Sequence, residues 1–340
     1  MTGYLRNAWY MAAWSHELGR EFLTRTILDE NIVLFRDAEG TATALVDRCP
    51  HRFAPLSRGR LVEDGVQCGY HGLTFDPHGH CIRNALDSKV PRAKIRHFSL
   101  CERDHIVWLW AGDPEYPDAK LVPDFSYITD PELKGIYGLS TFRANYELVT
   151  DNLMDLSHVE FLHPALGGAL LEGGQHTVDV KGNRVYSNWR TQDVPNTVSL
   201  EMWYPTHGKH IDHSFDMRWD PPANIYLGVG ATLTGRPREE GFTLPSAHLL
   251  TPETEASTHY FWHGALAKEH PQSLDDMRKI FTDAFDREDA PMLEAVQRNM
   301  DGDFWSLRPI MLATDAGAVR ARRVLTKLIE EERERNAASV

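Results

Sequence analysis

Short apolar runs separated by turn-forming residues dominate the first third of the chain. The runs cover residues 26–28, 32–35, 44–46 and 106–110, and Asp, Gly and Pro gather between them, as at 37–40 and 76–79. Runs of this length bounded by turn residues predict β-strands. We therefore expect the first part of the chain to be an all-β domain.

The rest of the chain mixes two periodicities. Apolar residues three or four apart predict helices over 145–162 and 273–300, and near 324–329. Alternating or β-branched segments predict strands at 198–202, 225–227 and 259–262. The segment 112–118 between the two parts is rich in Pro and acidic residues. We expect an α+β protein with one domain at 1–118, to which later segments can return, and a second at 119–340.

Composition narrows the class of protein. The 340 residues suffice for one large or two ordinary domains, and 42% of them are hydrophobic. The net charge of −13 and the pI of about 5.7 argue against a general nucleic-acid surface. No apolar run approaches the ~20 residues that span a bilayer, and the first residues lack the pattern of a signal peptide. We therefore expect a cytoplasmic protein that binds neither nucleic acid nor membrane.

Two short boxes each combine one cysteine with one histidine. Cys49 and His51 form the first box, 16 residues separate the boxes, and Cys68 and His71 form the second. Two thiolates on one iron and two imidazoles on the other would hold a [2Fe–2S] cluster of the Rieske type. Structural zinc is the alternative, but zinc fingers pair cysteine with cysteine and histidine with histidine. The mixed boxes favour the cluster.

A second possible metal site lies in the helical pattern at 145–162. His158 and His163 are about 140° apart on an ideal helix and share no face unless the helix ends between them. Pro164 and the glycines that follow it predict such an end. Two imidazoles and one carboxylate form the facial triad of non-haem iron oxygenases. Spacing alone does not choose between Asp286 and Asp289 as the carboxylate.

Two polar residues precede the histidine pair on the same helical face. Asp155 lies one turn before His158 and could accept its second ring N–H, or connect an imidazole of the cluster to the iron site. Asn152 could reach the iron as a weak contact.

The chain resembles the Rieske non-haem iron oxygenases, specifically the oxygenase components of the vanillate O-demethylase and dicamba monooxygenase type. The resemblance covers essentially all 340 residues. Its motifs are Asn7-Ala8-Trp9-Tyr10, Cys49-Pro50-His51-Arg52, Cys68-Gly69-Tyr70-His71-Gly72, Asp151-Asn152-Leu153-Met154-Asp155-Leu156, Leu250-Thr251-Pro252-Glu253-Thr254, Glu288-Asp289 and Arg308-Pro309.

This resemblance implies roles for the site residues. Cys49, His51, Cys68 and His71 would bind the cluster, and His158, His163 and Asp289 would bind a mononuclear Fe(II). Asp155 would connect His71 of one subunit to His158 of its neighbour in a homotrimer. The second domain would be a helix-grip, START-like fold, in which a curved antiparallel sheet surrounds a long helix.

The resemblance also implies an activity. A flavin- and ferredoxin-type reductase would pass electrons from NAD(P)H to the cluster, and O₂ would oxidise a methyl or methoxy group of an aromatic acid, as in O-demethylation with release of formaldehyde. The alternatives are methyl or ring hydroxylation of another aromatic compound, such as an arylsulfonate, and an electron carrier with an inert second domain. His248 could anchor the substrate, because histidine donates hydrogen bonds and can carry charge near neutral pH.

Overall fold

The computed structural model describes residues 3–164, 166–167 and 170–338, and the chain divides into two compact units. The N-terminal unit comprises Arg6–Val122 and Thr251–Thr254, and the C-terminal unit comprises Met1–Leu5, Pro123–Leu250 and Glu255–Val340. The main-chain N–H groups of Leu28 and Asp29 donate to the carbonyls of Pro252 and Glu253 at 2.9 and 3.0 Å. These bonds explain why the short segment 251–254 belongs with the N-terminal unit.

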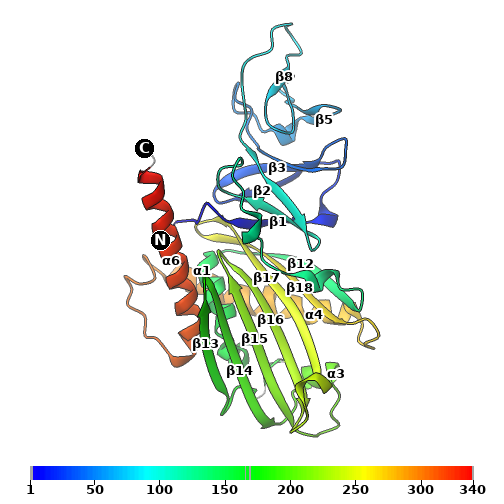
Figure 1. Ribbon diagram of the computed structural model, residues 1–340, viewed down its shortest axis with the longest axis vertical. Coiled ribbons are helices and arrows are strands. Elements are labelled where there is room, and N and C mark those ends of the chain that lie inside the picture. The colour runs from blue at the N-terminus through cyan, green and yellow to red at the C-terminus, as the bar shows by residue number, and fades with distance from the viewer. Residues whose placement is uncertain (1–2, 165, 168–169, 339–340) are drawn as a thin grey trace. The chain divides into compact units, whose positions relative to one another are not determined.

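The N-terminal unit is built from three small antiparallel sheets (Figure 1). The first has the order β1 (Trp9–Trp14), β11 (Ile106–Trp110), β10 (Leu100–Arg103); the second β2 (Leu23–Ile27), β3 (Glu30–Arg36), β4 (Ala42–Val46), β9 (His97–Phe98); the third β5 (Arg60–Val62), β6 (Gly65–Gln67), β7 (Thr74–Phe75), β8 (Cys81–Arg83). Fully buried Trp14, Phe35 and Trp108 fill the core. The all-β prediction for this part is confirmed.

The C-terminal unit is organised around a seven-stranded antiparallel sheet (Figure 1). Its order is β12 (Leu133–Phe142), β18 (Ser257–Ala267), β17 (Phe242–Thr254), β16 (Asn224–Leu233), β15 (Ile211–Asp220), β14 (Arg184–Val194), β13 (Gln175–Lys181). Strands β13 to β18 follow one another as a meander. Strand β12, which precedes them in the sequence, pairs with the last of them, β18. The expected combination of a β-domain with an α+β domain holding a large antiparallel sheet is confirmed.

One predicted strand is a helix. Residues 198–202 alternate apolar and polar side chains, but Val198–Trp203 form the short helix α3. The side chain of Thr197 accepts a hydrogen bond from the N–H of Leu200 and thereby caps the helix. The cap outweighs an alternation that is too short to specify a strand.

The predicted helix over 273–300 is a composite element that packs against the sheet. It consists of α4 (Leu274–Thr282), a π-helical segment η7 (Asp283–Asp289) and α5 (Ala290–Asn299). Phe281 of α4 lies 5.7 Å from the ring of Trp262 on β18, and Gly264 beside it has no side chain. A Cβ at Gly264 would come within 2.6 Å of the Phe281 ring, so glycine permits this close approach.

The C-terminal helix α6 (Ala316–Ala338) is fixed to α1 (Tyr146–Met154) through one buried arginine. The guanidinium of Arg322 donates to Asp151 at 2.7–2.9 Å and to Glu147 at 2.7 Å. Burial raises the pKa of Asp151 to about 6, although Arg322 opposes this effect. The ion pairs hold in place the helix that also carries Asn152. None of the helices within the described ranges is both long and apolar enough to cross a membrane.

Candidate functional site

The two cysteine–histidine boxes fold into loops with matching main-chain hydrogen bonds. The N–H of Cys49 donates to the carbonyl of Ala54 at 2.8 Å, and the N–H of Phe53 donates back to Cys49 at 2.9 Å. In the second loop, Cys68 donates to Leu73 at 2.8 Å and Gly72 donates to Cys68 at 3.0 Å. Both residues that donate back have a positive φ, 58° at Phe53 and 73° at Gly72.

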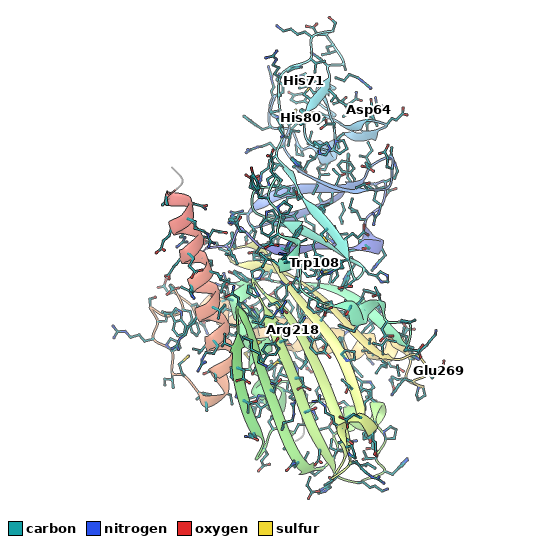
Figure 2. The ribbon with its side chains drawn as sticks, in the orientation of Figure 1. Asp64, His71, His80, Trp108, Arg218 and Glu269 are labelled. Carbon is teal, nitrogen blue, oxygen red and sulfur yellow. The ribbon has the colours of Figure 1, made fainter. Side chains whose placement is uncertain are left out.

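These loops present thiols on the inside and imidazoles toward solvent. Cys49 and Cys68 are buried and form no disulfide, whereas His51 and His71 are more accessible and the centroids of their rings lie 4.6 Å apart. Burial raises the pKa of the Cys49 thiol, and the adjacent Cys68 thiol raises it further. Within this unit, His71 lies far from Trp108 of β11 (Figure 2). Two buried thiols and two more accessible imidazoles are the donor set that would hold a Rieske [2Fe–2S] cluster.

The helical segment that leads to the histidine pair is interrupted at Asp155. The helix α1 ends at Met154, and Asp155 has φ −121° and ψ 92°, outside the helical region. Its carboxylate accepts the N–H of Ser157 at 2.9 Å and caps the short 3₁₀ segment η5 (Leu156–His158). The prediction of one helix over 145–162 is therefore wrong in this detail. A strong capping residue followed by another helical turn produces two elements instead of one.

Asp155 orients His158 through its main chain rather than through its carboxylate. The Nδ1 atom of His158 lies 2.7 Å from the carbonyl oxygen of Asp155. Because a carbonyl only accepts, Nδ1 must carry the proton, which leaves Nε2 with a free lone pair. Nε2 is the atom directed at Asp289.

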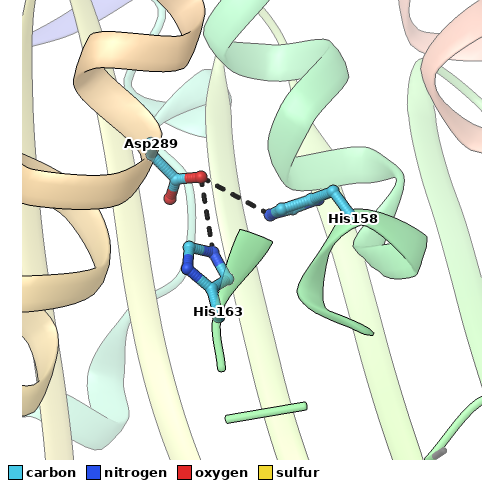
Figure 3. Close-up of side chains that lie close together, drawn as sticks. All are labelled: His158, His163 and Asp289. Carbon is cyan, nitrogen blue, oxygen red and sulfur yellow. Dashed lines mark ion pairs between the residues drawn. The ribbon is translucent and has the colours of Figure 1, made fainter. Parts of the chain in front are cut away.

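His163 is the residue at which the next helical turn ends. The helix α2 (Val159–Leu162) is one turn long, and His163 leaves it with φ −112° and ψ 79°, just before Pro164. Its Nδ1 lies 2.6 Å from Oε2 of Glu288, and its Nε2 lies 3.4 Å from Oδ1 of Asp289. The predicted helix end between the two histidines is confirmed, and it lets both imidazoles point to one place (Figure 3).

Asp289 completes this group from the far end of the π-helical segment. Its Oδ1 lies 3.6 Å from Nε2 of His158 and 3.4 Å from Nε2 of His163, and the ligand atoms all lie within 4.8 Å of one another (Figure 3). Asn152 donates to the same Oδ1 at 3.1 Å. Asp289 is buried, whereas Asp286 is exposed. The geometry thus brings Asp289, and not Asp286, to the histidines.

The π-helical segment accommodates Pro291, which directly follows it. In a regular helix Pro291 would have no N–H for the carbonyl of Arg287 and would clash with it. Here the N–H of Ala290 donates to the carbonyl of Phe285, five residues back, and Ala290 itself stays helical. Such wide turns often occur at functional sites. In this chain the wide turn ends at the buried Asp289.

The surroundings shift the pKa values of the two histidines in opposite directions. Burial lowers the pKa of His158. Burial also acts on His163, but hydrogen bonds to Asp289 and Glu288 outweigh it and raise the pKa of that imidazole. Two imidazoles and one carboxylate with an open side are the donor set that non-haem Fe(II) oxygenases use. The motif Glu288-Asp289 predicts no separate role for Glu288, whose hydrogen bond to His163 becomes visible only in the fold.

The three side chains line a pocket in the C-terminal unit. It encloses about 800 Å³, a volume that includes its opening to solvent. Apart from the metal-site residues, its described lining consists of Leu153, Leu156, Val159, Leu166, Leu170, Ser199, Leu200, Trp203, Phe215, Leu227, Val229, Leu244, Ser246, His248, Ile280, Phe281, Ala284 and Phe285. A mostly apolar pocket that ends on a metal-binding group is suited to hold an aromatic molecule against the metal.

His248 lies in the wall of this pocket, and its ring nitrogens have partners in the protein. Its Nε2 lies 2.9 Å from Oγ of Ser246, and its Nδ1 lies 2.6 Å from the hydroxyl of Tyr260. Burial lowers the pKa of His248 to about 4. Neither partner was singled out in the sequence, although Ser246 is two residues away on β17 and must share a face with His248.

Comparisons with known proteins agree with this architecture. Residues 8–96 match the model of the Rieske [2Fe-2S] domain, and residues 142–331 match that of the vanillate O-demethylase oxygenase C-terminal domain. The chain is 37% identical to the oxygenase component of chloroacetanilide N-alkylformylase from Rhizorhabdus wittichii, covering 97% of each chain. It is 35% identical to the oxygenase component of dicamba O-demethylase from Stenotrophomonas maltophilia, covering 97% of this chain and 99% of that one.

A solved structure gives the same result. Dicamba monooxygenase bound to dicamba superimposes with a TM-score of 0.88 at 34% identity, covering 98% of this chain and 99% of that one. Fold and site together define a Rieske non-haem iron oxygenase, with a [2Fe–2S] cluster, a mononuclear iron and a separate reductase as electron source. Within that class, the chain belongs to the family of vanillate O-demethylase oxygenase components. It is an O₂-dependent monooxygenase component, and neither a zinc protein nor a simple electron carrier.

Proposed function

We propose that the chain oxidises a methyl or methoxy carbon of an aromatic substrate, with O-demethylation as the principal reaction. The observation that supports this most is the apolar pocket that ends on His158, His163 and Asp289. Bound Fe(II) with O₂ supplies the oxidation of a C–H bond that the side chains cannot perform. A hydroxylated methoxy carbon is a hemiacetal, which separates into formaldehyde and a phenol.

The residues at this site have separate tasks in the proposal. His158, His163 and Asp289 hold the iron, and Cys49, His51, Cys68 and His71 hold the cluster. Asn152 donates to Oδ1 of Asp289 and fixes the direction of that carboxylate. The apolar walls orient the ring and exclude water from it.

Electron transfer in the proposal crosses between subunits of a homotrimer. Asp155 connects His71 of one subunit to His158 of its neighbour, and its main-chain contact of 2.7 Å to Nδ1 of His158 forms the inner half of that connection. A carboxylate that caps only the adjacent turn keeps a second oxygen for a partner outside the chain.

The charge of the substituents on the aromatic ring is a separate question. The family resemblance favours an aromatic acid as the substrate. The described lining of the pocket contains no Lys or Arg, which favours an uncharged aromatic molecule.

The test is substrate-dependent O₂ uptake by iron-replete protein with a surrogate ferredoxin and reductase. Methoxybenzenes, methoxybenzoates, methylbenzoates and arylsulfonates form the panel, and formaldehyde is measured in each reaction. We expect uptake with a stoichiometric amount of formaldehyde for a methoxy substrate. Uptake that gives only ring- or methyl-hydroxylated products would contradict demethylation and favour the hydroxylase alternative.

A further inference from the structure

The pocket at the metal site offers very few polar groups to a ligand. Outside the three metal-site residues, its described lining has only Ser199, Ser246, His248 and the indole of Trp203 as polar side chains, and no Lys, Arg, Asn, Gln or Tyr. The undescribed positions in the adjoining loop, 165 and 168–169, are Ala, Gly and Ala in the sequence and bring no charge. A ligand therefore meets no cationic side chain and no side-chain amide in this lining.

Ser246 and His248 already have hydrogen-bond partners in the protein, whereas the buried indole N–H of Trp203 has none among the described residues. The hydroxyl of Ser246 lies 3.1 Å from the carbonyl oxygen of Leu227 and 2.9 Å from Nε2 of His248. A carbonyl oxygen only accepts, so the serine donates to Leu227 and accepts the Nε2–H of His248. Nδ1 of His248 then has no proton and accepts the hydroxyl of Tyr260 at 2.6 Å.

This directed chain has one consequence for a ligand. It runs from Tyr260 through His248 and Ser246 to the carbonyl of Leu227. The O–H of Tyr260, the Nε2–H of His248 and the O–H of Ser246 are all donated within this chain. His248 is therefore a neutral imidazole with no N–H left to donate into the pocket. Ser199 also has a hydrogen-bond partner, since its hydroxyl lies 3.2 Å from Oγ1 of Thr197, with either oxygen able to donate.

An anionic substituent would meet no opposite charge among the side chains of this lining. Taking a carboxylate or sulfonate out of water is costly unless hydrogen bonds or an opposite charge replace the lost hydration. The reacting methyl or methoxy carbon must face the iron, so an anionic group elsewhere on the ring lies against the apolar walls. Burial of the uncharged ring, by contrast, is favourable on every side.

We propose that this oxygenase selects uncharged alkoxy- or alkyl-substituted aromatic substrates and discriminates against the corresponding aromatic carboxylates and sulfonates. The inference rests on the proposed function for the choice of reacting group.

The decisive experiment compares ligands that differ in charge and little in shape. The ortho, meta and para isomers of methoxybenzamide and methoxybenzoate are titrated into anaerobic iron-replete enzyme at pH 7.5 by calorimetry. We expect the best carboxamide to bind at least about tenfold more tightly than its own carboxylate. A carboxylate that binds as tightly as its carboxamide, or more tightly, overturns the proposal.

A variant tests the part that the hydrogen-bond chain plays. Ser246→Ala removes the acceptor of the Nε2–H of His248 and so frees one donor at the pocket wall. The preference for carboxamide over carboxylate should then fall severalfold. Thr243→Ala, at an exposed position of the same strand, is the matched control and should keep the preference of the wild type. An unchanged preference in Ser246→Ala overturns the role given to this chain.

Binding and turnover separate the two proposals. Carboxamide binding without O₂ uptake or formaldehyde from any methoxy compound would reject the demethylase function and leave the charge selection standing. Formaldehyde release from a methoxybenzoate that binds better than its carboxamide would confirm the demethylase function and reject the charge selection.

Discussion

The amide of Asn152 donates a hydrogen bond of 3.1 Å to Oδ1 of Asp289, the same oxygen that faces both imidazoles of the metal site. The two residues are 137 positions apart in sequence. Asn152 comes from α1 and Asp289 from the end of the π-helical segment, so this single bond joins the two helical elements that build the site. A donor beside a metal-binding carboxylate fixes its direction and moderates its basicity.

Asn152→Ala should weaken the hold on iron without abolishing it. Outer donors of this kind typically contribute about 10- to 100-fold to metal affinity or activity. The measurement is iron content after dialysis against a chelator of graded concentration, with the cluster absorption as an internal reference. Iron retention equal to that of the wild type would show that the amide does not support the carboxylate.

Asp289→Asn should lose the mononuclear iron and keep the cluster. The substitution removes the negative charge that a site with two neutral imidazoles needs, while the side chain keeps its shape. Metal analysis should fall from about three irons per chain to about two, since the cluster holds two. Asp286→Asn is the matched control, because Asp286 is exposed and three residues away on the same segment. Loss of iron in the control instead would reverse the assignment.

The choice between these two aspartates shows what the sequence can and cannot specify. The two mixed Cys/His boxes and the pair His158 and His163 could be predicted, because ligand types and spacing are local properties. The choice of Asp289 depends on the π-helical segment, and Pro291 is only an indirect sign of it in the sequence. Side-chain direction along 283–289 changes with one extra residue in a turn, which periodicity does not reveal.

Other features were beyond prediction for a similar reason. The interruption at Asp155 and the helix at 198–203 follow from capping bonds of Asp155 and Thr197 that compete with a periodic pattern. Glu288 and Tyr260 act through contacts with distant residues. Such contacts are set by the tertiary fold, whereas the large sheet and the all-β unit follow from repeated local patterns.

Glu288→Gln should weaken iron binding through His163. The carboxylate lies 2.6 Å from Nδ1 of His163 and favours the tautomer in which Nε2 is free for the metal. Glutamine keeps an oxygen for the same bond but loses the charge, so the loss should lie near the lower end of the usual 10- to 100-fold range. Chelator competition measures it. Glu294→Gln on α5 is the control, and an effect equal to that of Glu288→Gln would show that the loss is not specific.

Asp155→Asn should separate cluster integrity from turnover. Asparagine retains the side-chain oxygen that caps Ser157, and the main-chain contact to His158 is unaffected. We therefore expect normal cluster absorption, normal iron content and strongly reduced O₂ uptake, because an amide replaces the carboxylate proposed to meet His71 of the partner subunit. Asp179→Asn, at an exposed position of β13, controls for the loss of one charge. Normal turnover by Asp155→Asn would contradict the connecting role.

His213 is a buried histidine on β15 whose two ring nitrogens have no hydrogen-bond partner among the described residues. Burial lowers its pKa to about 4, with Glu160 and Arg190 as the charges that act on it in opposite directions. An unfolded histidine titrates near 6.5, so between pH 6.5 and 4 the unfolded chain binds a proton that the folded chain does not. Stability from this group is complete above pH 6.5 and is lost as the pH falls toward 4.

His213→Leu should therefore raise the free energy of unfolding more in acid than at neutral pH. The leucine removes an unpaired polar group and the proton uptake of the unfolded state, so its gain in unfolding free energy should be about 2 kcal/mol larger at pH 5 than at pH 7.5. Urea unfolding at the two pH values measures the difference. Thr191→Val is the control, because Thr191 lies opposite His213 on β14, its hydroxyl also has no partner in the described structure, and it does not titrate in this range. The same pH difference in both variants would exclude His213 as its source.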